Sequence, residues 1–144
     1  MKNKIVTFGE CMLELSQLNL SDYRLAYGGD TLNAAVYMAR AGADVRYLTA
    51  LGTDQYSDYL LDCWRREGVD TSLVTRFEGK VPGLYVINTD DHGERSFEYW
   101  RSAAPVKDLI QLKPELFAEM GDVDMFYLSG ITLSLFGEYD RAKI

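Results

Sequence analysis

The hexapeptide Gly28-Gly29-Asp30-Thr31-Leu32-Asn33 combines residue types that could bind the hydroxyl groups of a sugar. Two glycines let the backbone approach a ligand closely, and a helix beginning near Thr31 would direct unpaired N–H groups at that ligand. The Asp30 carboxylate can accept hydrogen bonds from two hydroxyls, and Asn33, one helical turn later, offers a donor and an acceptor. The alternative is an ordinary loop in which Asp30 caps the helix.

A second candidate is the run Tyr99-Trp100-Arg101. An arginine beside tyrosines on one face of a strand can form bidentate hydrogen bonds to a carboxylate, while the rings pack against the C–H face of a sugar. The alternative is a surface strand along which an arginine extends its stem toward solvent.

A hairpin would place Arg101 and two tyrosines on one face. The segments 83–89 and 95–101 alternate with period two, and Gly93 suits the left-handed position of a three-residue loop. This loop would pair Asp90 with Glu94, Ile87 with Phe97 and Tyr85 with Tyr99. Because alternate side chains of a strand share a face, Tyr85, Tyr99 and Arg101 would then lie together, and Ser96, Glu98 and Trp100 would form a more polar face.

The elements that would position these residues alternate between strands and helices. Short apolar runs predict buried strands, and apolar residues at helical spacing that end at glycine predict helices. The predicted strands cover 5–9, 46–50 and 124–130, and the predicted helices cover about 31–42, 56–66 and a last segment from Ser134. Asp54 stands where the cap of the helix over 56–66 belongs, which favours a structural role for it. This order predicts an α/β fold with a parallel sheet.

Composition and charge restrict the classes of function. With 144 residues, 47% of them apolar, the chain is long enough for one domain with a hydrophobic core. The formal net charge of -7 leaves no broad basic face for nucleic acid or a membrane surface. The apolar run after Lys4 is too short for a signal peptide, and no stretch approaches the length of a membrane span, so we expect a cytoplasmic protein.

Metal, redox and P-loop chemistry find little support in the sequence. Cys11 and Cys63 lack CxxC or histidine partner spacing, and we expect both to be buried thiols. His92 is the single histidine, which nearly excludes a catalytic triad or a multi-histidine metal site. The GxxxxGK[ST] pattern of a P-loop is absent.

The chain resembles the ribokinase/PfkB family of sugar kinases over residues 5–135, and within it the subgroup that acts on 2-keto-3-deoxygluconate. A Gly-Gly-x-x-x-Asn loop indicates the broad family, whereas its Asp-Thr-Leu filling together with Tyr-Trp-Arg indicates the subgroup. The matching segments are 9–15, 28–37, 49–54, 82–85, 93–95, 99–101 and 128–131.

The resemblance implies a ribokinase-like three-layer α/β sandwich that carries a small β lid, built from segments of about 11–26 and 83–101. Sugar would bind between the two parts, and the lid often forms homodimer contacts in relatives. Carried onto matching positions, Gly29, Asp30 and Asn33 would hold sugar hydroxyls, Tyr85 would line the pocket, and Tyr99 and Arg101 would meet the acid end of the substrate. ATP would donate its γ-phosphoryl group to the 6-hydroxyl of the acidic sugar, with Mg²⁺ assisting.

The family's Gly-Ala-Gly-Asp segment, with the catalytic base, and its nucleotide pocket belong to a C-terminal half that has no counterpart here. We therefore expect residues 1–144 to be the N-terminal part of one kinase domain, incomplete by truncation, with no catalytic or metal-binding residue and no kinase activity alone. Two alternatives stay open. The parent could be a fructokinase or ribokinase, or the chain could be a non-catalytic module for sugar binding or dimerisation.

Overall fold

A computed structural model describes residues 3–144 and contains two sheets. The central sheet is wholly parallel, with strand order β5-β4-β1-β8. Its strands are β1 (Lys4–Phe8), β4 (Asp44–Gly52), β5 (Val74–Phe77) and β8 (Met125–Tyr127). The first two predicted strands are confirmed, β4 being longer at both ends than the predicted segment.

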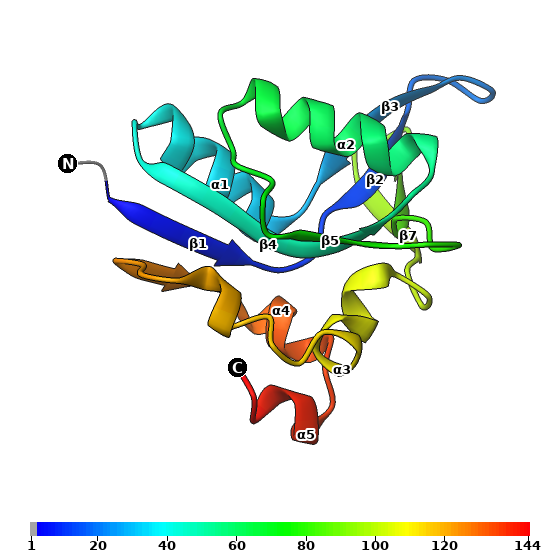
Figure 1. The fold of residues 1–144 in the computed structure, drawn as a ribbon. Coiled ribbons are helices and arrows are strands. Elements are labelled where there is room, and N and C mark those ends of the chain that lie inside the picture. The colour runs from blue at the N-terminus through cyan, green and yellow to red at the C-terminus, as the bar shows by residue number, and fades with distance from the viewer. Residues whose placement is uncertain (1–2) are drawn as a thin grey trace.

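Helices cover both faces of the central sheet (Figure 1). On one face lie α1 (Asp30–Arg40) and α2 (Gln55–Arg66), and on the other lie η1 (Pro105–Asp108), α3 (Leu109–Leu112), α4 (Gly130–Ser134) and α5 (Glu138–Arg141), with η2 (Ala118–Met120) in the same segment. Side chains of β4 alternate between the two cores, since Val45 and Tyr47 pack toward α1 and α2 and Leu48 packs toward residues 104–136. This arrangement is the predicted three-layer α/β sandwich.

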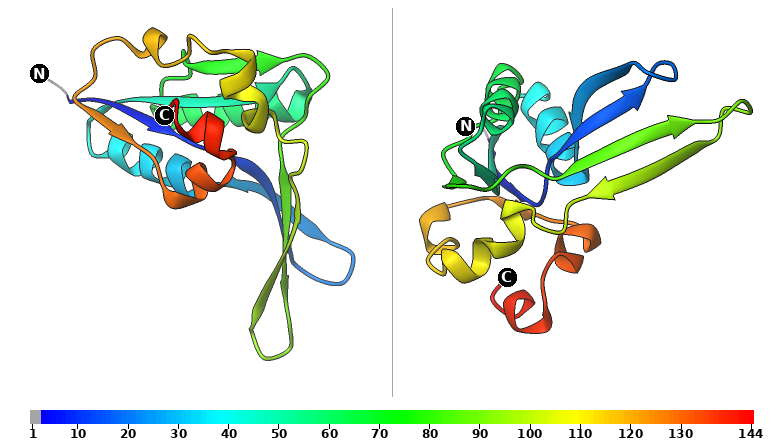
Figure 2. Two further views of the ribbon diagram at one scale, coloured as in Figure 1. Left: turned by 90° about the horizontal axis from the view of Figure 1, so that it is seen from below. Right: turned by 90° about the vertical axis from the view of Figure 1, so that its right-hand side faces the viewer.

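The second sheet has the strand order β3-β2-β6-β7, and its two hairpins extend away from the central body (Figure 2). Its strands are β2 (Met12–Gln17), β3 (Tyr23–Gly28), β6 (Leu84–Thr89) and β7 (Arg95–Trp100). The predicted hairpin register is confirmed, with Tyr85 opposite Tyr99, and Gly93 has a φ of 82°. The segments 11–26 and 83–101, which we predicted as two parts of one lid, thus lie in a single sheet.

Two details of the fold differ from prediction. The strand predicted over 124–130 covers only Met125–Tyr127 and is partly exposed, because β8 is an edge strand with one neighbour in the part of the chain described. Where one helix was predicted from Ser134 onward, the structure has two short helices. Helix α4 begins at Gly130, where the Ser129 hydroxyl accepts a hydrogen bond from the Thr132 N–H and caps it, and it ends at Ser134. Helix α5 then begins at Glu138. All residues of β7 are exposed, including those of its aromatic face, with 47% of Phe97 and 53% of Tyr99 open to solvent.

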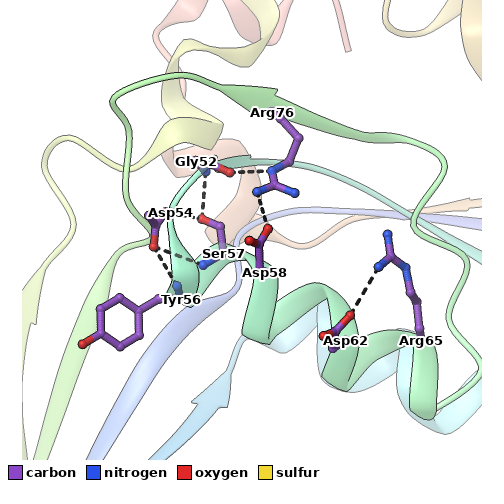
Figure 3. Close-up of polar contacts among 8 residues, drawn as sticks. All are labelled: Gly52, Asp54, Tyr56, Ser57, Asp58, Asp62, Arg65 and Arg76. Atoms are coloured by element: carbon purple, nitrogen blue, oxygen red, sulfur yellow. Dashed lines mark hydrogen bonds and ion pairs between the residues drawn. The ribbon is translucent and has the colours of Figure 1, made fainter.

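Asp54 caps α2, as predicted, at the end of β4 (Figure 3). Its carboxylate accepts hydrogen bonds from the Tyr56 and Ser57 N–H groups at 2.9 and 3.2 Å and from the Ser57 hydroxyl at 2.6 Å. Burial by itself would raise the pKa of Asp54, but these hydrogen bonds outweigh burial and leave the pKa lowered. The Ser57 hydroxyl in turn accepts the Gly52 N–H, which ties the helix start to the sheet.

We expect Asp54→Ala to lower the free energy of unfolding by about 1 kcal/mol at pH 7, the usual cost of a lost cap. Because the folded-state pKa of Asp54 is lowered, its contribution is present above the ordinary aspartate pKa of about 4 and is lost as the pH falls through the folded-state value. Urea titrations of both proteins at pH 7 and pH 3 measure this difference. A difference in the free energy of unfolding that is larger at pH 3 than at pH 7 would contradict the role of Asp54 as a cap.

Cys11 and Cys63 are both buried free thiols, as predicted, and burial raises the pKa of Cys11 well above its ordinary value. Over residues 3–144, none of the helices combines the length and the apolar character that crossing a bilayer requires.

Candidate functional site

The chain passes between the two sheets four times, and these four connections meet around Glu10. They are the segments 9–11 after β1, Gly29 before α1, 78–83 before β6 and 101–104 after β7. The Leu13 N–H donates to the Gly83 carbonyl at 2.8 Å, and a Cβ at Gly83 would lie 2.8 Å from Glu10 Oε1 and 3.1 Å from Arg101 Cβ. A carboxylate and a guanidinium thus lie at the junction of the sheets.

Glu10 is 6% exposed, and its Oε2 forms an ion pair with an Arg101 terminal nitrogen. Burial raises the pKa of Glu10, although the Arg101 charge and hydrogen bond and the charge of Lys107 oppose this rise. Within residues 3–144 the other oxygen, Oε1, has no hydrogen-bond partner. Because a buried acceptor without a partner is costly, Glu10 Oε1 is a candidate contact for a ligand at this junction.

The glycine turn before α1 lies against the other side of Glu10. A Cβ at Gly29 would clash with the Glu10 carbonyl oxygen, so this close approach requires glycine. Gly29, not Asp30 or Thr31, is the N-cap of α1, and no side chain caps this helix. The alternative interpretation of Asp30 as a cap is therefore wrong, because Thr31 is turned into the core, where its hydroxyl lies 3.2 Å from the Tyr47 hydroxyl, and Asp30 is the first helical residue.

Asp30 and Asn33 face outward at the start of α1. Asp30 is partly exposed and Asn33 is exposed, which leaves their polar groups accessible to a ligand. With Gly29 they form the first turn of an 11-residue helix, whose free N–H groups and dipole favour hydroxyl or anionic ligands.

Tyr85 lies close to this turn but is already hydrogen-bonded. Its hydroxyl donates to Glu14 Oε2, and Glu14 Oε1 accepts from the Ser16 hydroxyl at 2.7 Å. Burial and the adjacent Glu14 carboxylate raise the pKa of Tyr85 well above its ordinary value. The Tyr85 ring lies 5.9 Å from the Tyr99 ring, at an interplanar angle of 32°, as the predicted shared face requires.

A depression of 530 Å³ opens at the base of the hairpin. Its lining residues are Val81, Pro82, Tyr99, Trp100, Arg101, Ser102, Ala103, Ala104 and Lys107. It includes Tyr99 and Arg101 from the predicted site, but not Gly29, Asp30, Asn33 or Tyr85. The predicted residues thus form two groups, one at the α1 turn and one in this depression. Glu10 links the two groups, because its backbone carbonyl lies against Gly29 and its carboxylate pairs with Arg101.

Glu10, Glu14 and Lys107 were not among the functional residues predicted from the sequence. Glu10 and Glu14 lie within a segment that carries the family resemblance, and Glu10 follows the strand-ending Gly9, where ligand-binding residues of parallel sheets gather. The position of Glu10 directly after this strand was the one feature of the sequence that could have indicated its role. A partner 91 positions away in the sequence could not be deduced from spacing.

The residues described here do not fit a metal site. Among residues 3–144, no group of three His, Cys, Asp or Glu side chains is arranged to hold a metal ion. No magnesium-dependent step is therefore assigned to side chains of this chain.

Comparison with known proteins decides the family, since the model of the pfkB family of carbohydrate kinases matches residues 2–142. The chain belongs to the pfkB family. Among curated pfkB proteins, the 2-dehydro-3-deoxygluconokinases of Escherichia coli K12 and Dickeya dadantii are 45% and 43% identical to it. Those alignments cover 100% and 97% of this chain but only 48% and 47% of the relatives. The chain therefore spans about half the length of these relatives.

Solved structures of pfkB proteins share the fold. The 2-dehydro-3-deoxygluconokinase of Thermotoga maritima matches with a TM-score of 0.80 and 26% identity, over 94% of this chain and 44% of that one. The fructokinase of Xylella fastidiosa matches with a TM-score of 0.66 and 31% identity, over 74% of this chain and 34% of that one. The expected ribokinase-like fold, present in part, is thus confirmed.

Proposed function

We propose that this chain supplies the sugar-binding half of an ATP-dependent kinase that phosphorylates the 6-hydroxyl of 2-keto-3-deoxygluconate, a sugar acid also called 2-dehydro-3-deoxygluconate. The observation that supports the acidic substrate best is Arg101, which is fixed by Glu10 at the edge of a depression that Tyr99 also lines. The relatives of 40–45% identity, all named 2-dehydro-3-deoxygluconokinase, agree with this substrate.

The proposed roles follow the two groups of residues. Gly29, Asp30 and Asn33 would bind hydroxyls through the α1 turn, and Tyr85 would line the pocket beside them. Tyr99 and Arg101 would bind the carboxylate, because a guanidinium and a phenol hydroxyl can both donate to it. Holding both ends would fix the 6-hydroxyl in place, and phosphoryl transfer depends mainly on such positioning.

The second sheet would act as the lid of the kinase. It joins the central body through the four connections around Glu10, so a change in its tilt would move Arg101 relative to the α1 turn. A closed lid would exclude water that could otherwise accept the phosphoryl group. We also propose that two copies of the protein form a homodimer through the exposed faces of this sheet.

Isothermal titration calorimetry of the purified chain tests the substrate. We expect saturable binding of 2-keto-3-deoxygluconate that is at least tenfold tighter than binding of fructose or ribose, since a charged hydrogen bond contributes about 1.5–3 kcal/mol. Equal affinity for fructose would favour the fructokinase alternative, which the 29% identity to a probable fructokinase-3 of Arabidopsis thaliana keeps in view.

A second measurement separates the kinase from a non-enzymatic sugar-binding module. We expect the chain alone to show no sugar-dependent consumption of ATP, and we expect the encoding DNA to continue in frame into a Gly-Ala-Gly-Asp segment. Sugar-dependent turnover by the chain alone, or a stop codon directly after codon 144 in the gene, would contradict this division of roles.

A further inference from the structure

The depression at the hairpin base has an excess of positive charge on a chain whose net charge is -7. Arg101 and Lys107 line it, and no carboxylate does so among the residues described. The Arg101 charge is balanced by the buried Glu10. An ion pair of this kind is nearly neutral as seen by a ligand at a distance, so Arg101 orients an anion more than it attracts one.

Lys107 provides the charge that is not balanced. Its neighbour Asp108 is the nearest carboxylate in the sequence, and this carboxylate is paired with Lys80 at 2.6 Å. Within residues 3–144, Lys107 has no ion-pair partner within 4.0 Å. Lys107 is partly buried as a residue. A cation that is partly shielded from water attracts an anion more strongly than a fully exposed one does.

Two backbone hydrogen bonds fix the conformation of the turn that leads from Arg101 to Lys107 after β7. The Ala104 N–H donates to the Arg101 carbonyl at 3.2 Å, and the Lys107 N–H donates to the Ala104 carbonyl at 3.1 Å. Ala104 and Val106 are 2% and 1% exposed, which anchors this turn in the core below the sheet. Pro105 begins the short helix and favours its backbone conformation.

We propose that Lys107 is a specificity-determining residue that binds the carboxylate of the sugar acid together with Arg101. This inference rests on the proposed function and adds the residue that supplies the net charge. Arg101 has five N–H donors and uses one terminal nitrogen for Glu10, so further donors stay available for a ligand oxygen. Tyr99 and Trp100, which are 53% and 57% exposed, provide aromatic walls for the carbon chain beside the acid group.

The probe for this subsite is pyruvate, which has the carboxylate, keto group and third carbon that begin a 2-keto-3-deoxy sugar acid. Titration of the ¹⁵N-labelled chain, followed by NMR, reports binding at individual backbone N–H groups. We expect pyruvate to shift the signals of Ala104 and Lys107, and the neutral analogue acetone not to shift them. Lys107→Met keeps the apolar stem and should weaken pyruvate binding about three- to tenfold, as expected for a partly exposed charge.

Two variants serve as controls. Lys107→Arg keeps the charge and should bind pyruvate within about twofold of the unchanged chain. Lys113→Met removes the same charge outside the depression, where Lys113 pairs with Glu119 at 2.9 Å, and should leave binding unchanged. The spectra themselves show whether each variant is folded.

Unchanged pyruvate affinity in Lys107→Met, equal losses in Lys107→Met and Lys113→Met, or no binding of pyruvate to the chain would each overturn the inference. A different outcome would contradict the proposed function but not the role of Lys107. If pyruvate binds with the expected dependence on Lys107 but 2-keto-3-deoxygluconate binds no tighter than pyruvate, the carboxylate subsite stands and the proposed substrate is wrong.

Discussion

Arg101→Met is expected to weaken binding of 2-keto-3-deoxygluconate at least tenfold and to leave binding of fructose within about twofold. The difference arises because a charged hydrogen bond contributes about 1.5–3 kcal/mol, whereas a neutral sugar has no carboxylate for the guanidinium to bind. Calorimetric titration of both sugars into both proteins measures it. Equal losses for the two sugars would show that Arg101 acts through the structure of the pocket and not through the acid group.

The same variant is expected to lower the free energy of unfolding by about 1–3 kcal/mol at pH 7, because it leaves the Glu10 carboxylate buried without its cation. The cost is below the about 3–5 kcal/mol of a fully buried pair, since the Arg101 side chain is 25% exposed. Without Arg101, burial of Glu10 is opposed by the charge of Lys107 and no longer by that of Arg101, so the pKa of Glu10 rises further. A carboxyl group with a raised folded-state pKa destabilises the folded protein as the pH rises and the group ionises. The stability lost in Arg101→Met should therefore shrink as the pH falls from 7 toward 4.

A double-mutant cycle with Glu10→Gln isolates the pair. In the Glu10→Gln/Arg101→Met protein no buried charge lacks a partner, so we expect most of the stability lost in Arg101→Met to return. Chemical denaturation of the four proteins gives the coupling energy. Additive losses would mean that the contact between Glu10 and Arg101 contributes nothing to the fold.

Trp64→Ala is expected to lower the free energy of unfolding by about 3–5 kcal/mol, the largest effect on stability that we predict. Trp64 is fully buried between α2 and the sheet, and its ring meets that of Tyr47 edge to face at 5.1 Å. The Tyr47 hydroxyl lies 3.2 Å from the Thr31 hydroxyl in the first turn of α1. A cavity at position 64 would therefore loosen both the core and the support of the glycine turn.

Trp100→Ala provides a matched control, because the chain has two tryptophans and this one is 57% exposed on β7. The same truncation there should change the free energy of unfolding by less than about 1 kcal/mol, as surface substitutions usually do. Urea denaturation followed by circular dichroism measures both variants. Similar losses in the free energy of unfolding for the two variants would contradict the burial of Trp64.

Local patterns in the sequence predicted most secondary structure. Helix α2 combines a capping aspartate, an apolar face and a closing glycine, and these local signals agree with one another. The β6–β7 register followed from a short loop and from the two-residue alternation of side chains. Prediction failed at β8 and at the α1 cap. Strand β8 has β1 as its single neighbour among residues 3–144, and Gly29 is constrained by the backbone of Glu10. Neither arrangement can be deduced from the residues next to it in the sequence.

For this protein, local patterns in the sequence determined the α/β fold with a parallel sheet and the pairing of Tyr85 with Tyr99. Both depend on periodicity and turn chemistry, which act over short stretches of chain. The three-layer sandwich and the roles proposed for the sugar-binding residues followed from the resemblance to a known family. Only the tertiary structure decided that Glu10 pairs with Arg101 and that Lys107 lines the same depression as Tyr99. Such contacts arise where four connections between two sheets meet, and no local pattern encodes that meeting.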